Sequence, residues 1–124
     1  MSSEQEITTV LNTYLDGLYR GDTARLRTVF HPRSALFGDV RGAPYQSAVE
    51  GWLEALAKRQ SPFAAGEEFK MRILSIEVTR DIACAKANCP MLGFNYIDYL
   101  SLVRHDGQWL IANKLFANVP EQDA

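Results

Sequence analysis

A single carboxylate, Asp98, stands in an otherwise apolar run that extends from Tyr96 to Val103. Removing water from an ionised acid is costly unless the acid is paired or protonated. Asp98 is therefore expected either to be held by a specific partner or to be placed for chemistry. On an apolar wall it could anchor a polar atom of a ligand or, as a catalytic group, help to stabilise charge that develops during a reaction.

Tyr14 is the first side chain expected beside Asp98. It lies on the apolar stripe of a predicted helix, and a buried tyrosine hydroxyl needs a hydrogen-bond partner. The pair could hold a ligand oxygen together, or Asp98 could accept a hydrogen bond from Tyr14 and only order the core. Both interpretations stay open from the sequence.

The Asp106-Gly107 turn predicts the neighbours of Asp98 on the next strand. In a simple hairpin register Asp98 faces Leu115, and Asn113 lies diagonally beside it as a second polar ligand contact. In that register Lys114 faces away and is interpreted as a surface or interface charge. The surface of Asp98 would also carry three apolar ligand contacts, Tyr96, Leu100 and Trp109.

Three further side chains have two interpretations each. Asp39 is a candidate catalytic base, although its Gly38-to-Gly42 setting is also typical of a turn. His31 precedes Pro32 and could satisfy terminal helix carbonyls or serve as the base. Trp52 has the spacing of a buried helix face and could also contact a ligand. The two histidines lie far apart and lack paired carboxylates, so we expect neither a metal nor a cofactor.

The bulk properties exclude several classes of function. The chain has 124 residues and a formal net charge of −2, so we expect one domain over residues 1–124 and no nucleic-acid partner. A basic leader and a long apolar span are both lacking at the sequence level, which predicts no membrane association and a cytoplasmic location. Cys84 and Cys89 have an odd spacing within one strand, so they should point to opposite faces and both be free, buried thiols.

Periodicity predicts three helices followed by a β meander. The first helix has a Ser3–Glu6 capping box and stops at Gly21, and the third has a Ser47–Glu50 box. The second helix starts at Asp22 and ends at His31-Pro32. Strands are predicted over 35–39, 69–78 with a β-bulge at its change of phase, 82–89, the run around Asp98, and 109–116, with a loop through Gly42 and Pro44.

This order predicts an α+β fold in which three N-terminal helices pack on one face of a strongly curved antiparallel sheet. Such a cone-shaped domain has a mouth that suits a small molecule. The opposite sheet face carries apolar side chains such as Ile97 and Tyr99 and needs a cover. We therefore expect a homodimer through the outer sheet face.

Several segments resemble the nuclear-transport-factor-2-like superfamily, which has a cystatin-like fold, and within it the lumazine-binding branch near the SnoaL-like and steroid-isomerase-like proteins. The resemblance covers nearly the whole chain. It rests on Tyr14–Asp22, Phe30-His31-Pro32, Asp98–Leu102, Asp106–Trp109 and Asn113-Lys114. Proteins of this superfamily include isomerases, dehydratases, cyclases, hydrolases and interaction domains, so the resemblance indicates a fold more than an activity.

The resemblance also implies roles for two residues. Steroid isomerases of this superfamily use a tyrosine, a protonated acid and an aspartate base. By motif, Tyr14 falls on the tyrosine, Asp98 on the neutral acid and Gly38 on the base, so the base is missing. Three functions remain open: a protein that binds a small apolar or heteroaromatic ligand, an isomerase, dehydratase or cyclase that stabilises an enolate-like oxyanion, and a dimeric interaction module.

Overall fold

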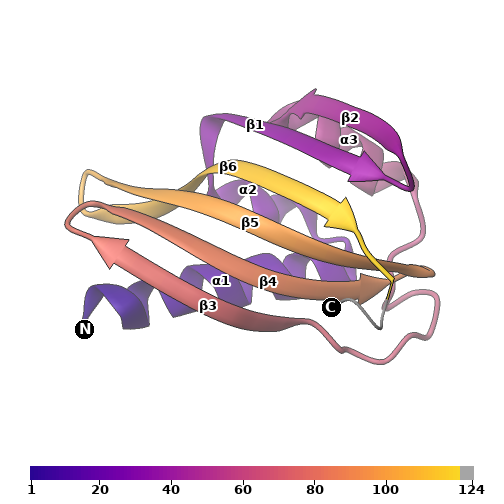
Figure 1. Cartoon of the computed structure of the whole chain (residues 1–124), viewed down its shortest axis with the longest axis horizontal. Coiled ribbons are helices and arrows are strands. Elements are labelled where there is room, and N and C mark those ends of the chain that lie inside the picture. The colour runs from indigo at the N-terminus through magenta and orange to yellow at the C-terminus, as the bar shows by residue number, and fades with distance from the viewer. Residues whose placement is uncertain (121–124) are drawn as a thin grey trace.

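Three helices and one six-stranded sheet form two layers in residues 1–120, the part of the chain that the computed structural model describes (Figure 1). The helices are α1 (Ser3–Arg20), α2 (Thr23–Val29) and α3 (Val49–Lys58). The strands are β1 (Phe30–Val40), β2 (Ala43–Ala48), β3 (Arg72–Thr79), β4 (Ile82–Met91), β5 (Phe94–His105) and β6 (Gln108–Asn118). The predicted α+β class with three helices is confirmed.

The helix ends differ from the predicted caps. Ser2 caps α1: its hydroxyl accepts from the backbone N–H of Gln5, whose side chain in turn accepts from the Ser2 N–H, so the Ser3–Glu6 box was wrong by one residue. The N-cap of α3 is Ala48 and has no side-chain cap. Glu50 instead forms a bidentate ion pair with Arg27 of α2.

The sheet has the strand order β2-β1-β6-β5-β4-β3 and is mixed. All neighbours are antiparallel except β1 and β6, which run parallel because the chain passes through the whole β-meander before β6 returns beside β1. The predicted wholly antiparallel, strongly curved sheet is wrong in both respects, since the ribbon twists without curling into a cone (Figure 1). β2 was also missed, because this mostly exposed edge strand has little apolar alternation.

Two β-bulges interrupt the antiparallel ladders. The predicted bulge in β3 is confirmed, because the pairing with β4 shifts between Ile73 and Ser75. The second bulge lies in β6 and was not predicted: Leu102 pairs with Ile111, whereas Ser101 pairs with Asn113, which leaves Ala112 unpaired. A bulge turns every later side chain to the other face.

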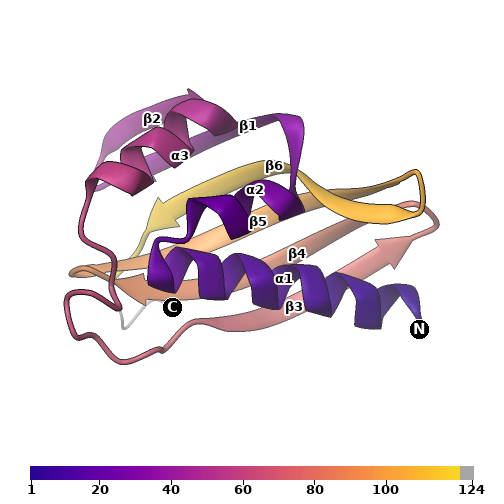
Figure 2. The same ribbon diagram turned by 180° about the vertical axis from the view of Figure 1, so that it is seen from behind.

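All three helices cover the same face of the sheet, as both sides of the ribbon show (Figures 1 and 2). We call this the inner face and the uncovered one the outer face. The core lies between the helices and the inner face, where Tyr14, Leu36 and Leu100 are fully buried. Both cysteine thiols are free as predicted, but only Cys89 is buried, so the expected burial of Cys84 was wrong.

Candidate functional site

The bulge at Ala112 decides which β6 side chains join Asp98. With the shifted register Asp98 pairs with Phe116 and Leu100 pairs with Lys114, so Lys114 lies on the inner face. The prediction that Lys114 faces away is therefore wrong. Asn113 points to the other face, where its amide Nδ2 donates to the backbone oxygen of Ala35, so it is not the neighbour of Asp98 that the simple register implied.

Three polar side chains converge on one oxygen of Asp98. The Tyr14 hydroxyl donates to Oδ2 at 2.5 Å, the Cys89 thiol donates to it at 3.5 Å, and the Lys114 ammonium lies 3.9 Å away. Asp98 is only 1% exposed and Lys114 only 6%. The other carboxylate oxygen, Oδ1, is buried and has no hydrogen-bond partner among the described residues.

Burial dominates the titration of the groups around Asp98. It raises the pKa of the Tyr14 hydroxyl well above its ordinary value, and the negative charge of Asp98 adds to that shift. The pKa of the Cys89 thiol is raised for the same two reasons. For Lys114, burial lowers the pKa of the ammonium, and Asp98 opposes part of that shift. The tyrosine and the thiol are therefore kept protonated as donors, whereas burial disfavours the charged form of the lysine.

A cavity of about 180 Å³ lies between α3 and the inner face and is bordered by this cluster. Asp98, Lys114 and Cys89 supply polar atoms to its wall, and the remaining lining is mostly aromatic or aliphatic. The lining residues are Leu18, Val40, Tyr45, Trp52, Ala55, Leu56, Arg59, Cys89, Met91, Tyr96, Asp98, Lys114 and Phe116.

Four of the predicted site residues gather at this cavity. Asp98, Trp52 and Tyr96 line it, and the ring centroid of Trp52 lies 4.4 Å from the Lys114 nitrogen. Tyr14 lies behind the wall: it is fully buried, it is not part of the lining, and its hydroxyl proton is directed at Asp98. Tyr14 can therefore orient and polarise Asp98, but its hydroxyl does not itself border the cavity.

The other predicted site residues lie elsewhere. Leu100 and Trp109 are buried in the core outside the lining. His31 accepts from the backbone N–H of Arg33 and packs edge-to-face with His105, at 6.2 Å between ring centroids. Asp39 is exposed, and its carboxylate accepts from the N–H of Gly42, as expected for the turn interpretation. Neither candidate base lines the cavity of Asp98.

The position of the missing base is filled by a neighbouring ring. Gly38 pairs with Phe116, and a Cβ added at Gly38 would lie 2.4 Å from the Phe116 ring. A larger side chain at position 38 would therefore collide with Phe116, which itself lines the cavity. The cavity lining thus includes Asp98 and Lys114 but no side chain from position 38.

Sequence reasoning missed Lys114, Cys89 and Arg59 as cavity residues. For Lys114 the available signal was its place among apolar residues of β6, but the assumed register turned it outward. Cys89 lies nine residues before Asp98 and meets it only because β4 and β5 pair. Arg59 follows the last residue of α3, and no local pattern distinguishes it from a solvated charge.

The fold and the sequence together identify the class of the protein. A structure described as an NTF2-like protein of unknown function from Shewanella baltica superposes with a TM-score of 0.83 at 23% identity, covering 98% of this chain and 99% of that one. A second, from Silicibacter pomeroyi, gives a TM-score of 0.79 at 20% identity, with 96% and 100% covered. These similarities establish a nuclear-transport-factor-2-like fold.

The family follows from the sequence itself. The family model described as "Putative lumazine-binding" matches residues 2–117, and the chain therefore belongs to this family. Among characterised relatives, a protein named aldolase FrzH from Cladobotryum sp. is 28% identical over 109 residues, which cover 86% of this chain and 84% of the relative. Within residues 1–120, no helix is long and apolar enough to cross a membrane.

Proposed function

We propose that this protein binds a compact, largely apolar molecule that carries a carbonyl group, with Lys114 and Asp98 as its polar contacts. The observation that carries the proposal is the buried pair itself: a nitrogen donor and a carboxylate whose Oδ1 has no hydrogen-bond partner among residues 1–120, both in a mostly apolar cavity lining. The Lys114 nitrogen suits a carbonyl oxygen, and Asp98 Oδ1 suits an N–H or O–H nearby on the same ligand.

The size of the cavity limits the ligand. A volume of about 180 Å³ is below the roughly 300 Å³ at which pockets begin to hold drug-sized molecules. An engineered apolar cavity of about 150 Å³ in another protein holds benzene, so a single ring with a few substituents fits the available space. The description of the family as lumazine-binding supports a ligand that has both carbonyl and N–H groups.

A second candidate, catalysis through an enolate, is favoured because Asp98 Oδ1 has no hydrogen-bond partner among the described residues. A free carboxylate oxygen could remove a proton from the carbon next to the ligand's carbonyl, while Lys114 stabilises the negative charge that develops on the carbonyl oxygen. Tyr14 would hold Asp98 in orientation through its hydrogen bond. Aldol reactions proceed through such enolates, and the relative named as an aldolase supports this class.

Ligand-dependent thermal stabilisation tests the binding proposal. Cyclohexanone and lumazine are the probes, and methylcyclohexane, which lacks the carbonyl group, is the matched control. We expect stabilisation by the carbonyl compounds in the wild type and its loss in Lys114→Met. Equal stabilisation by cyclohexanone and methylcyclohexane would show that the cavity does not recognise the carbonyl group.

Exchange of the α-protons of cyclohexanone in deuterated water, followed by NMR, tests the catalytic candidate. Removing a general base typically lowers a rate by a factor of about 10² or more. Asp98→Asn should therefore abolish exchange above the buffer rate, and Tyr14→Phe should reduce it less. An exchange rate in the wild type equal to that of buffer alone would leave binding as the function.

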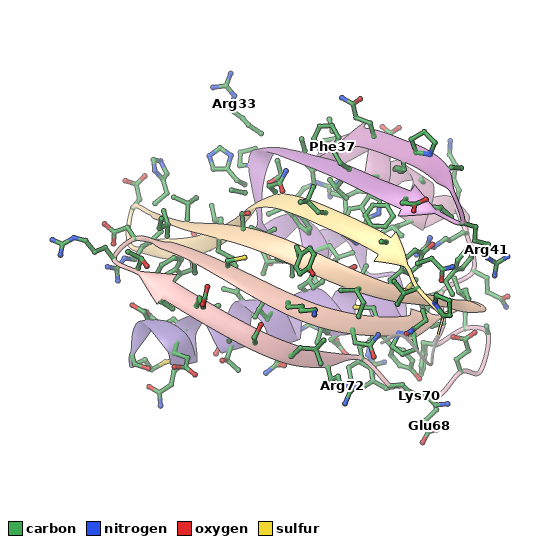
Figure 3. All side chains as sticks on the ribbon, viewed as in Figure 1. Arg33, Phe37, Arg41, Glu68, Lys70 and Arg72 are labelled. Carbon is green, nitrogen blue, oxygen red and sulfur yellow. The ribbon has the colours of Figure 1, made fainter. Side chains whose placement is uncertain are left out.

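The outer face supports a homodimer as the proposed assembly. Phe37, Leu115 and Tyr99 pair in turn across three strands and are each 41–50% exposed, so they form one apolar stripe. Figure 3 labels Phe37 on β1. The stripe borders a groove of about 550 Å³ with Asp39 on β1 and Lys86 on β4. A copy related by a two-fold axis could place its Lys86 against this Asp39 and the reverse, as an isologous interface requires.

A further inference from the structure

We propose that Lys114 is a nucleophile that forms a Schiff base with a small aldehyde or ketone bound in the cavity. This inference rests on the proposed function, because it needs a carbonyl compound beside Lys114. It goes beyond that function by replacing a hydrogen bond to the carbonyl oxygen with a covalent bond to the carbonyl carbon. Amine side chains of lysine form such adducts when they are neutral and desolvated.

The surroundings of the Lys114 nitrogen are those of a reactive lysine. The nitrogen lies 4.4 Å from the ring centroid of Trp52, 5.1 Å from that of Phe116 and 5.3 Å from that of Tyr14. These rings exclude water from three directions, and the side chain still borders the cavity. The other three lysines of the chain, Lys58, Lys70 and Lys86, are exposed or half-buried.

The charges of Asp98 and Arg59 act in opposite directions on the pKa of the Lys114 ammonium. Burial lowers the pKa of the ammonium most, Asp98 raises it, Cys89 raises it less, and Arg59 at the cavity lowers it. A desolvated lysine near a second cation is a known way to obtain a neutral amine near neutral pH. Asp98 is 3.9 Å away and is close enough to take up the proton after a small movement of either side chain.

The reaction balances with the groups present. The Lys114 ammonium gives one proton to Asp98, and the free amine adds to the carbonyl carbon. The carbonyl oxygen takes a proton from the nitrogen and becomes a hydroxyl group. The nitrogen lone pair then forms the C=N bond while the C–O bond breaks, and the Asp98 proton leaves with the hydroxyl as water. A protonated imine remains beside the Asp98 carboxylate, so the net charge of the site is unchanged.

The second carboxylate oxygen of Asp98, Oδ1, would act as a base toward this adduct. A protonated imine withdraws electrons from the adjacent carbon, and Oδ1 has no other hydrogen-bond partner among the described residues. The adduct would therefore make a proton on that carbon more acidic in front of an available base. Formation or cleavage of a bond between that carbon and a second carbonyl carbon would proceed through the same intermediate.

Reductive trapping tests the proposal directly. The wild-type protein is incubated with cyclohexanone and sodium cyanoborohydride, digested, and mapped by mass spectrometry for lysines that carry a cyclohexyl group. We expect Lys114 to be labelled at least about tenfold faster than Lys58 and Lys70, since the cavity holds the carbonyl compound beside its amine. The preference should vanish in urea, where all lysines are exposed.

Two variants and one readout separate the possible outcomes. Lys114→Arg keeps a cation beside Asp98 but has no nucleophilic amine, and Lys86→Arg is the matched control on the outer face. Label on Lys58 and Lys70 without label on Lys114 in the wild type would overturn the covalent proposal. If cyclohexanone still stabilises that unlabelled protein thermally, the proposed function stands and only the Schiff base is lost; without stabilisation both fail.

Discussion

Asp98 and Lys114 form a buried ion pair, an arrangement that is costly for a small domain. Both side chains are almost fully removed from solvent, and their 3.9 Å separation is long for a hydrogen-bonded pair. Desolvation of two charges is often not repaid by their mutual attraction, and apolar residues of similar size frequently give equal or higher stability. The pair is therefore better explained by its position at a cavity than by a contribution to folding.

Substitution at both ends of the pair tests this explanation. Asp98→Asn should lower the free energy of unfolding by about 3 kcal/mol, because it leaves the Lys114 ammonium buried without a counter-charge. Adding Lys114→Met should restore most of that loss. Urea unfolding of the four proteins of this cycle gives the coupling energy. A double variant as unstable as the sum of the two single variants would contradict the account.

The stability of the fold at alkaline pH follows from three groups of this cluster. The pKa values of Cys89 and Tyr14 are raised above their ordinary 9.0 and 10.0, mainly by burial. Their contribution to stability is fully present below those values and is lost as the pH rises toward the folded pKa values. The pKa of Lys114 is lowered from 10.5 by burial, so the unfolded chain binds more protons there and stability rises with pH up to 10.5.

Two variants should therefore change the dependence of folding stability on alkaline pH in opposite directions. Tyr14→Phe removes a group that must stay protonated, so the loss of stability above pH 10.0 should become shallower. Lys114→Met removes the opposing contribution, so the loss above pH 9.0 should become steeper. Urea midpoints followed by tryptophan fluorescence across this range measure both slopes. Parallel profiles for the two variants would contradict the assignment.

At the scale of elements, one unpaired residue in β6 positions the site. Ala112 breaks the alternation of the strand, and only residues beyond it change face relative to a regular hairpin. The Trp109 and Ile111 side chains thus remain in the core while Lys114 and Phe116 also turn inward. The bulge allows a lysine and a carboxylate from neighbouring strands to share one cavity.

Deletion of Ala112 should restore the regular register and move Lys114 to the outer face. We expect a protein that still folds but binds cyclohexanone at least about tenfold more weakly, which corresponds to losing about 1.4 kcal/mol of contact. Peptide mapping after amine acetylation should find Lys114 as reactive as Lys70. Substitution Ala112→Ser, which keeps the strand length, is the control. A deletion variant with Lys114 still protected would show that the bulge merely moved along the strand.

The pairing of β1 with β6 leaves no room for a larger side chain at Gly38. Phe116 occupies the space in front of Gly38, so Gly38→Ala should destabilise the fold by about 1–3 kcal/mol through overpacking. Replacing Phe116 by Leu in the same protein should recover much of that stability. Thermal unfolding of the two variants and their combination measures the effect. No destabilisation by Gly38→Ala would mean that the ring moves aside freely.

At the scale of the whole molecule, the helices of residues 1–120 leave the other sheet face uncovered (Figure 1). Tyr99 is half exposed at the β5 end of the outer stripe, so Tyr99→Lys should be tolerated by the monomer. If two copies pack through this face, the substitution should convert a dimer to a monomer, as buried like charges oppose association. Light scattering after size exclusion measures the mass. A wild-type monomer at micromolar concentration would contradict the proposed assembly.

Local sequence patterns determined much of this protein. The apolar spacing of α1 and α3, the left-handed Gly21 that ends α1, and the Asp106-Gly107 turn depend on neighbours a few residues apart, and each lies where the pattern indicated. The contact between Tyr14 and Asp98 was also expected, since a buried hydroxyl and a buried acid each need a partner.

Only the tertiary structure decided the parallel pairing of β1 with β6 and the face on which Lys114 lies. Both depend on how strands distant in sequence align, and a shift of one residue exchanges the two faces of a strand. The residues next to Ala112 in the sequence do not indicate that it is unpaired, because the bulge is defined by pairing and packing across the sheet. Asp98 was therefore recognisable from the sequence, whereas the lysine beside it was not.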